Sequence, residues 1–165
     1  MPVRLDNRQK DFMRRLGEAS IDGYGYVDIE PWRSIAVLET KEMIGAAYSL
    51  RSKKLIEITT EKPPTYQMTK NGREWYEGDL EKLKKLKHLG ITELEDEILR
   101  DLCREELNDI GRHKLKYYSV FDKADEPEKT EAALSLERKQ FVYINNHEIF
   151  DLKLAFNGVN YCRTL

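Results

Sequence analysis

Apolar residues recur three and four positions apart in the first part of the chain, which is the spacing of a helix with one buried face. This spacing predicts a first helix over residues 7–19. A short extended piece is expected around residues 24–29, and a short second helix over residues 32–38 follows Pro31. A third helix is predicted over residues 40–53. The first part of the chain therefore has three expected helices and one short extended piece.

Short apolar runs separated by turn residues follow the third helix. Residues 55–58 are predicted to form a strand, residues 59–64 a turn-rich tip, and residues 66–69 the return strand of a hairpin. Residues 72–89 then fit one helix, ended by Gly90, whose leucines recur at every third position and sweep around the helix. A dimerising coiled coil needs a sustained heptad, so this helix is expected to connect two domains instead. The inward positions of the first unit form its expected core: Leu16, Met43, Ala47, Leu50, Leu55, Ile58 and Trp75.

The same pattern occurs twice, because residue n resembles residue n + 86 without gaps. The segment AAYSLRSKKLIEI (46–58) aligns with AALSLERKQFVYI (132–144). Seven of the 17 positions in 42–58 are identical, where average composition gives roughly one. An Asn-Gly pair at residues 71–72 aligns with another at residues 157–158. An ungapped repeat, as opposed to coincidental helix periodicity, predicts two units with equal loop lengths throughout.

Helix-start signals correspond between the two units as well. Asp6 and Gln9 have the spacing of a capping box, and so do Thr92 and Glu95. The repeat and these signals predict a first domain over 1–79, a connecting helix over 80–90 and a second domain over 91–165.

Two segments of the first unit resemble a known family. Residues 50–56 (LRSKKLI) and 66–75 (YQMTKNGREW) are similar to stretches of bacterial winged-helix regulators of the MarR and PadR kind. In those regulators, a helix ending in Leu and basic residues leads to an apolar strand and a Tyr-x-Leu-Thr-x-x-Gly return strand. The match covers residues 40–78 well and the preceding helices only by periodicity. The resemblance implies an α+β fold with two winged helix-turn-helix domains in tandem, joined by the connecting helix, and a DNA-binding regulatory function.

Composition and charge indicate which classes of protein the chain can belong to. No apolar run approaches the roughly 20 residues that span a bilayer, and the N-terminus lacks the apolar core of a signal peptide, so we expect a soluble cytoplasmic protein. The net charge of −2 argues against indiscriminate binding of polyanions. Residues 1–86 carry 16 Lys or Arg against 14 Asp or Glu, whereas residues 87–165 carry 12 against 16. The first unit is therefore the better candidate for contact with nucleic acid.

Motifs of catalysis and of metal binding are absent from the sequence. Cys103 and Cys162 lie far apart without a CxxC pattern, so we expect two reduced thiols and neither a disulfide nor a zinc site. There is no phosphate-binding loop, HExxH, GxSxG or EF-hand pattern. The acidic residues 93–97 begin a helix, where negative charge is favourable, and a lone His147 in a turn is typical of a solvated side chain. We expect a protein that is not an enzyme and holds no metal or cofactor.

A winged helix normally lays its third helix in the major groove of DNA and its wing along the backbone. Tyr48 and Ser49 are expected to reach base edges, while cations neutralise phosphates. The alternatives are an ordinary solvated helix face and, for Tyr48, a place in the core, since its counterpart is Leu134. Glu42 would be repelled by phosphate. The full set of expected DNA-binding residues is Lys41, Tyr48, Ser49, Arg51, Ser52, Lys53, Lys54 and Lys62.

The third helix of the second unit is acidic and suits DNA poorly. It is expected to begin at Pro127, and it carries Glu128, Glu131 and Glu137. We expect this unit to associate with a protein partner or with itself. The alternative function for the whole chain is a non-enzymatic tandem winged-helix scaffold that binds only proteins.

Overall fold

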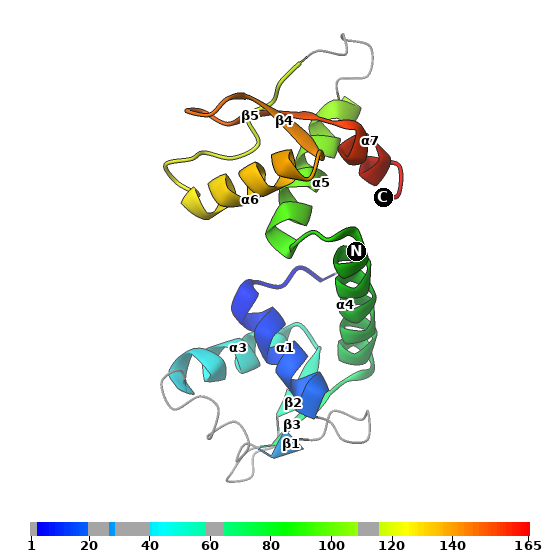
Figure 1. Ribbon diagram of the computed structural model, residues 1–165. Helices are drawn as coiled ribbons and strands as arrows, with labels where there is room; N and C mark the ends of the chain where they lie inside the picture. Colours follow the sequence, from blue (N-terminus) through cyan, green and yellow to red (C-terminus); the bar gives the residue numbers. More distant parts are fainter. Residues whose placement is uncertain (1–2, 20–26, 29–39, 59–64, 109–115) are drawn as a thin grey trace. The chain divides into compact units, whose positions relative to one another are not determined.

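The computed structural model describes residues 3–19, 27–28, 40–58, 65–108 and 116–165 (Figure 1). The chain divides into Met1–Lys82 (unit 1) and Leu83–Leu165 (unit 2), and each unit combines helices with antiparallel strands, so the fold class is α+β. Unit 1 contains α1 (Asn7–Ala19), β1 (Val27–Asp28), α3 (Thr40–Ser52), β2 (Ile56–Ile58), β3 (Thr65–Met68) and most of α4 (Lys70–Leu89). Unit 2 contains the end of α4, then α5 (Glu93–Asn108), α6 (Pro127–Arg138), β4 (Val142–Asn146), β5 (Asp151–Leu154) and α7 (Phe156–Cys162).

The helices predicted for the first part of the chain are confirmed where the structure describes them. α1 has the predicted bounds, α3 ends one residue before the predicted end, and α4 includes the whole predicted helix over 72–89. Gly90 ends α4 with a φ of 68°, a conformation that glycine adopts without steric cost. The predicted second helix over 32–38 and the turn-rich tip over 59–64 lie outside the described residues.

Both predicted hairpins are formed. In unit 1, β3 lies between β1 and β2 in an antiparallel sheet of order β1-β3-β2, with Ile56 opposite Met68. In unit 2, β4 pairs with β5, with Val142 opposite Leu154. Each residue of this second pair follows its counterpart in the first by 86 positions, so the two hairpins have the same register.

The expectation of equal loop lengths is wrong for the segment after the first helix of each unit. In unit 1 the third strand brings Val27 opposite Tyr66. In unit 2 the position equivalent to Tyr66 is Leu152, and it exchanges two backbone hydrogen bonds of 2.8 Å with Tyr118. A constant shift of 86 would have placed residue 113, the equivalent of Val27, opposite Leu152. α5 has 16 residues where α1 has 13, and the bridging residue lies further along the chain than the repeat predicts.

The two predicted capping boxes begin α1 and α5. The Gln9 backbone N–H donates to Asp6 Oδ1 at 2.8 Å, and the Asp6 N–H donates to Gln9 Oε1 at 3.3 Å. In unit 2 the Glu95 N–H donates to Thr92 Oγ1 at 3.2 Å, and the Thr92 N–H donates to Glu95 Oε2 at 2.8 Å. Each pair satisfies two backbone donors at a helix start that would otherwise lack partners.

Gly72 lets the start of α4 pack directly on the residue before β2. Its N–H donates to Thr69 Oγ1 at 3.1 Å, which caps α4, and the Thr69 N–H donates to the Leu55 carbonyl at 3.0 Å. A Cβ at Gly72 would overlap the Leu55 carbonyl oxygen. Gly158 stands in the same relation to the carbonyl oxygen of Phe141 in unit 2. Only glycine fits either position, because any side chain would force the backbones apart.

The third helix of each unit ends in the same left-handed turn. Lys54 has a φ of 59°, its N–H donates to the Arg51 carbonyl at 2.9 Å, and the Leu55 N–H donates to the Leu50 carbonyl at 3.0 Å. This pair of bonds is a Schellman motif, and glycine is usual at its left-handed position. Gln140, with a φ of 62°, occupies that position in unit 2. A side chain in this conformation costs roughly 1 kcal/mol, so neither unit has its most stable helix end.

Each unit has a hydrophobic core of its own. Four residues of the expected core of unit 1 are buried, namely Leu16, Ala47, Leu50 and Leu55. Ile58 and Trp75 are half-buried and pack against that core, and the side chain of Met43 lies outside the described residues. The core of unit 2 is built from α5, α6 and the β4–β5 hairpin, together with Leu86 from the end of α4.

The two cysteines form a disulfide, so the expectation of reduced thiols is wrong. Cys103 in α5 and Cys162 at the end of α7 are separated by 59 residues, and their Cα atoms lie 5.7 Å apart. The equivalent positions of unit 1 are Gly17 and Tyr76, and a Cβ at Gly17 would overlap the ring of Tyr76. Unit 1 therefore joins these two helices by packing a ring against glycine, whereas unit 2 joins them covalently.

Candidate nucleic-acid interface

The structure leaves several of the expected DNA-binding side chains exposed on α3 and at its end. The side chain of Tyr48 is 56% exposed, so this tyrosine is not a core residue. Arg51, Ser52 and Lys54 are exposed as well. The Ser52 hydroxyl donates to the Tyr48 carbonyl at 3.0 Å, one turn back along the helix. Tyr48, Arg51, Ser52 and Lys54 thus offer an aromatic ring, a hydroxyl and two cations to an external ligand.

Two other expected residues make internal hydrogen bonds instead. The Ser49 hydroxyl accepts a hydrogen bond of 2.8 Å from the Gln9 side chain. The Lys53 ammonium donates to Gln9 Oε1 and to the Arg4 carbonyl, each at 2.8 Å. Both side chains are half-buried between α3 and the start of α1. Their hydrogen bonds hold α1 on α3, which makes them poor candidates for contact with bases or phosphates.

Unit 2 repeats this cluster of hydrogen bonds with a charge added. Lys139, equivalent to Lys53, donates to both carboxylate oxygens of Glu95 at 2.9 and 2.8 Å. Burial by itself raises the pKa of Glu95, but hydrogen bonds from Lys139, Ser135 and Thr92 outweigh it and lower the pKa. The Ser and Lys that are identical in both copies of the repeat therefore act inside each unit.

The remaining expected residues cannot be placed on a surface. Lys41 belongs to α3, but its side chain lies outside the described residues, and so does the whole of Lys62. Sequence reasoning missed Ile44, whose side chain is 43% exposed one turn before Tyr48. Spacing alone gave no signal for it, because Ile44 is apolar and lies three positions before the buried Ala47.

The counterpart face on α6 carries two carboxylates and one cation, the exposed Arg138 at the position equivalent to Ser52. Glu131 is exposed at the position equivalent to Gly45, and Glu137 stands where unit 1 has Arg51. The Glu137 carboxylate accepts a hydrogen bond of 3.3 Å from the Ile144 backbone and lies 3.4 Å from His147 Nε2. It therefore covers the outer edge of β4, which is a common way to shield an unpaired strand.

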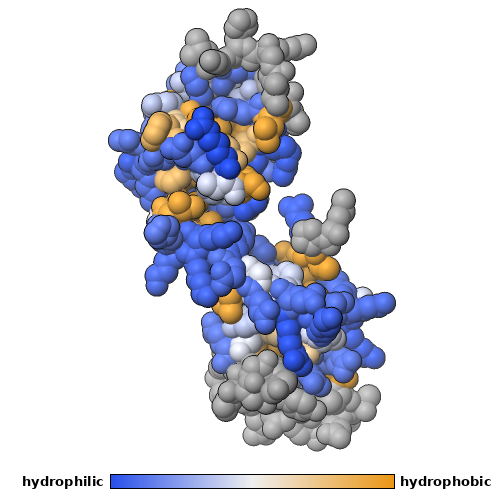
Figure 2. Space-filling view, turned by 90° about the vertical axis from the view of Figure 1, so that its right-hand side faces the viewer, coloured by the Kyte–Doolittle hydropathy of each residue, from blue (hydrophilic) through white to orange (hydrophobic). Residues whose placement is uncertain are grey.

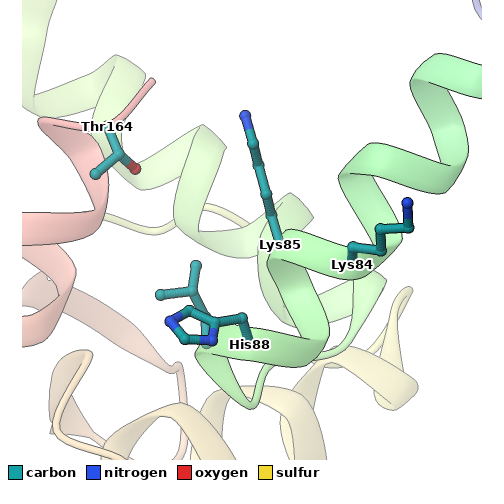
Figure 3. A pocket seen from close by; sticks show the side chains of 5 residues that line it. Lys84, Lys85, His88 and Thr164 are labelled. Atoms are coloured by element: carbon teal, nitrogen blue, oxygen red, sulfur yellow. The ribbon is translucent and has the colours of Figure 1, made fainter.

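A pocket of about 410 Å³ in unit 2 offers a different cluster of cations. It is lined by Lys84, Lys85, His88, Leu89 and Thr164 (Figure 3). The side chains of Lys84 and Lys85 extend in different directions from α4 and do not converge on one point. A specific small-ligand site needs convergent polar groups, so this pocket is a weaker candidate than the face of α3.

The described surface gives no sign of a metal site. Within the described residues, no three His, Cys, Asp or Glu side chains are grouped so that they could hold a metal ion.

On the face drawn in Figure 2, hydrophobic residues form separate patches among hydrophilic ones. No helix in the described part of the chain is long and apolar enough to cross a membrane.

Comparisons with protein-family models, with curated proteins and with solved structures find no match to this chain. The function must therefore be argued from the geometry and charge of the chain's own residues.

Proposed function

We propose that unit 1 binds duplex DNA through the exposed face of α3, and that unit 2 associates with a protein partner or with a second copy. A helix, a short strand, a further helix and a hairpin, with sheet order β1-β3-β2, support a winged-helix interpretation of unit 1. In that architecture α3 is the helix that enters the major groove. Unit 2, with the same hairpin register, supports a second winged helix in tandem.

The observation that carries this proposal is the contrast between two equivalent helices. From residue 44 to residue 54, the chain has no Asp or Glu and three cations, of which Arg51 and Lys54 are exposed. The same stretch of unit 2 carries Glu131 and Glu137 against Arg138 and Lys139, so its formal charges cancel. The buried Ala46, Ala47 and Leu50 are identical to Ala132, Ala133 and Leu136, so the two helices share this part of the core and differ in net charge.

The positive charge at the end of α3 favours binding to a phosphate backbone. Each cation that neutralises a phosphate releases counterions, which strengthens binding at low salt and adds about one unit to the salt dependence of the affinity. A carboxylate brought to the same place opposes binding. Arg51 and Lys54 both lie at the end of α3, so they are placed to hold the backbone beside a groove that the middle of the helix enters.

The test is to give α3 the two carboxylates that α6 carries at equivalent positions. The double variant Gly45→Glu, Arg51→Glu copies Glu131 and Glu137, which the same scaffold already accommodates in unit 2. We expect the full-length wild type to bind a labelled duplex at about 50 mM salt, and the double variant to bind at least tenfold more weakly. Thermal unfolding followed by circular dichroism should show that the variant is folded.

A matched control makes the same change in net charge elsewhere. The variant Gly78→Glu, Lys85→Glu alters two exposed positions of α4 and should bind DNA within about twofold of the wild type. Equal loss in both variants would mean that net charge, and not the face of α3, governs binding. Undiminished binding by the α3 variant would remove this face from the proposal.

The surface of unit 2 favours a protein partner for that unit. Tyr143 is 54% exposed and Phe156 is 76% exposed, where unit 1 has Glu57 and Lys70. Exposed aromatic side chains are enriched at protein interfaces. We expect the variant Tyr143→Glu, Phe156→Lys to lose self-association or partner binding in sedimentation experiments. If no duplex binds the wild type at all, a scaffold that binds only proteins becomes the better proposal.

A further inference from the structure

Three neighbouring positions in the middle of α3 are exposed and carry no charge. Ile44 is 43% exposed and Tyr48 is 56% exposed, and the two are one helical turn apart. Gly45 is exposed beside them. Residues at these spacings lie on one side of a helix, so Ile44, Gly45 and Tyr48 form a single surface, here called the α3 ridge.

Packing against the described residues of unit 1 does not account for the α3 ridge. A Cβ at Gly45 would have no atom within 4 Å, so an alanine would fit, and alanine is strongly preferred to glycine inside a helix. Neither Ile44 nor Tyr48 belongs to the hydrophobic core of unit 1. In unit 2 the counterpart of Tyr48 is Leu134, which packs against the core. The ridge is therefore shaped for something outside the unit.

The combination of residues indicates what that partner presents. Ile44 and Tyr48 offer apolar contact, and the missing side chain at Gly45 leaves room for close approach to the helix backbone. Arg51 and Lys54, at the end of the same helix, favour a polyanion. In the major groove of a polyanionic duplex, the only apolar group on a base edge is the methyl group of thymine.

Building on the proposed DNA binding by unit 1, we propose that the α3 ridge reads thymine methyl groups in the major groove. Ile44 and Tyr48 pack against the methyl groups, and Gly45 lets the helix enter deeply enough for this contact. Arg51 and Lys54 hold the flanking phosphates and fix the register of the helix. Burial of one methyl group corresponds to about fourfold in affinity.

The experiment starts by selecting the preferred duplex of the full-length chain from a random pool. That duplex is then made in a second form, in which deoxyuridine replaces thymidine and so removes only the methyl groups. We expect the wild type to lose about fourfold in affinity for each contacted methyl. The Ile44→Ala variant should bind both forms of the duplex nearly equally, because the group that senses the methyl is gone.

Gly45 is tested against a second exposed glycine. Gly45→Ala should weaken binding to the selected duplex, whereas Gly78→Ala on α4, where a Cβ also meets no atom within 4 Å, should not. Both substitutions should stabilise their helices, so loss of fold cannot explain a difference in binding.

The outcomes separate this inference from the function on which it rests. Selected duplexes without thymine, or equal affinity of the wild type for both forms, would overturn readout by the α3 ridge. Loss of affinity that is the same in the wild type and in Ile44→Ala would also overturn it. If Gly45→Glu, Arg51→Glu still abolishes binding in these cases, the proposed function stands. If no duplex is enriched, both proposals fail.

Discussion

Reduction of the Cys103–Cys162 disulfide should destabilise unit 2 and leave unit 1 unchanged. The bond joins α5 to α7 across 59 residues of sequence. In the chain-entropy account, a closed loop of about 60 residues stabilises the folded state by about 4 kcal/mol, because the crosslink restricts the unfolded chain. α7 has only seven residues and is too short to persist as an isolated helix, so its attachment depends on such contacts.

The positions of the aromatic residues provide an assay for each unit. Both tryptophans, Trp32 and Trp75, belong to unit 1, so tryptophan fluorescence reports on that unit alone. Circular dichroism reports on the helices of both. With a urea m-value of about 1–2 kcal/mol/M for a unit of this size, reduction by a dithiol should lower the unfolding midpoint of unit 2 by about 2–4 M urea. The fluorescence midpoint should stay where it is.

Two controls show whether a change in the stability of unit 2 comes from the disulfide. The variant Cys103→Ser, Cys162→Ser should resemble the reduced protein and should not respond to dithiol. Thiol titration should show two free thiols after reduction of the wild type. If two thiols appear and the transition of unit 2 does not move, the crosslink does not stabilise unit 2. An equal shift of the tryptophan signal would show that the two units do not unfold separately.

Five further substitutions test the fold, four by urea unfolding and Glu95→Gln by its sensitivity to acid. Gly72→Ala should cost about 1–3 kcal/mol, because its Cβ would overlap a backbone carbonyl, whereas Gly78→Ala should add up to about 1 kcal/mol. Leu50→Ala should cost about 2–5 kcal/mol. Gln140→Gly should stabilise unit 2 by up to about 1 kcal/mol, because glycine relieves the positive φ. Folding lowers the pKa of Glu95, so its carboxylate stabilises unit 2 at pH values above the unfolded pKa near 4.5. This stabilisation is lost as the pH falls through the folded pKa. Glu95→Gln removes the titrating group, so the stability of unit 2 should depend less on acid pH.

Local patterns were sufficient to predict the regular elements of the fold. Helical spacing gave the bounds of α1, and the capping boxes marked the starts of α1 and α5, because each signal lies within a few residues of the structure that it forms. The Cys103–Cys162 disulfide could not be predicted in this way. Its partners are distant in sequence, and no local pattern distinguishes a bonded pair from two separate thiols.

DNA binding by α3 stays a prediction, but the structure divides the expected residues into exposed and internally bonded ones. Ser49 and Lys53 are polar and lie near the end of a helix, which is typical of a ligand-binding residue and of an internal one alike. These two residues lie on the side of α3 that contacts the start of α1, where the Gln9 side chain forms hydrogen bonds with both. Ile44 is apolar and lies three positions before the buried Ala47, so the sequence does not indicate that it is 43% exposed.

The internal repeat separates residues that build the fold from residues that act on a partner. A polar residue that is identical in both copies has the same internal role in both, as Lys53 and Lys139 do when they bind the start of the preceding helix. The identity of such a residue in both copies is explained by its role in the fold and does not indicate a ligand. The outer side of the helix is less constrained, and there the copies diverge from Gly45 to Glu131 and from Arg51 to Glu137, which also accepts a hydrogen bond from the Ile144 backbone. Since the scaffold tolerates either charge, the fold does not determine which one is present, and the charge on each exposed face is the better guide to what that unit binds.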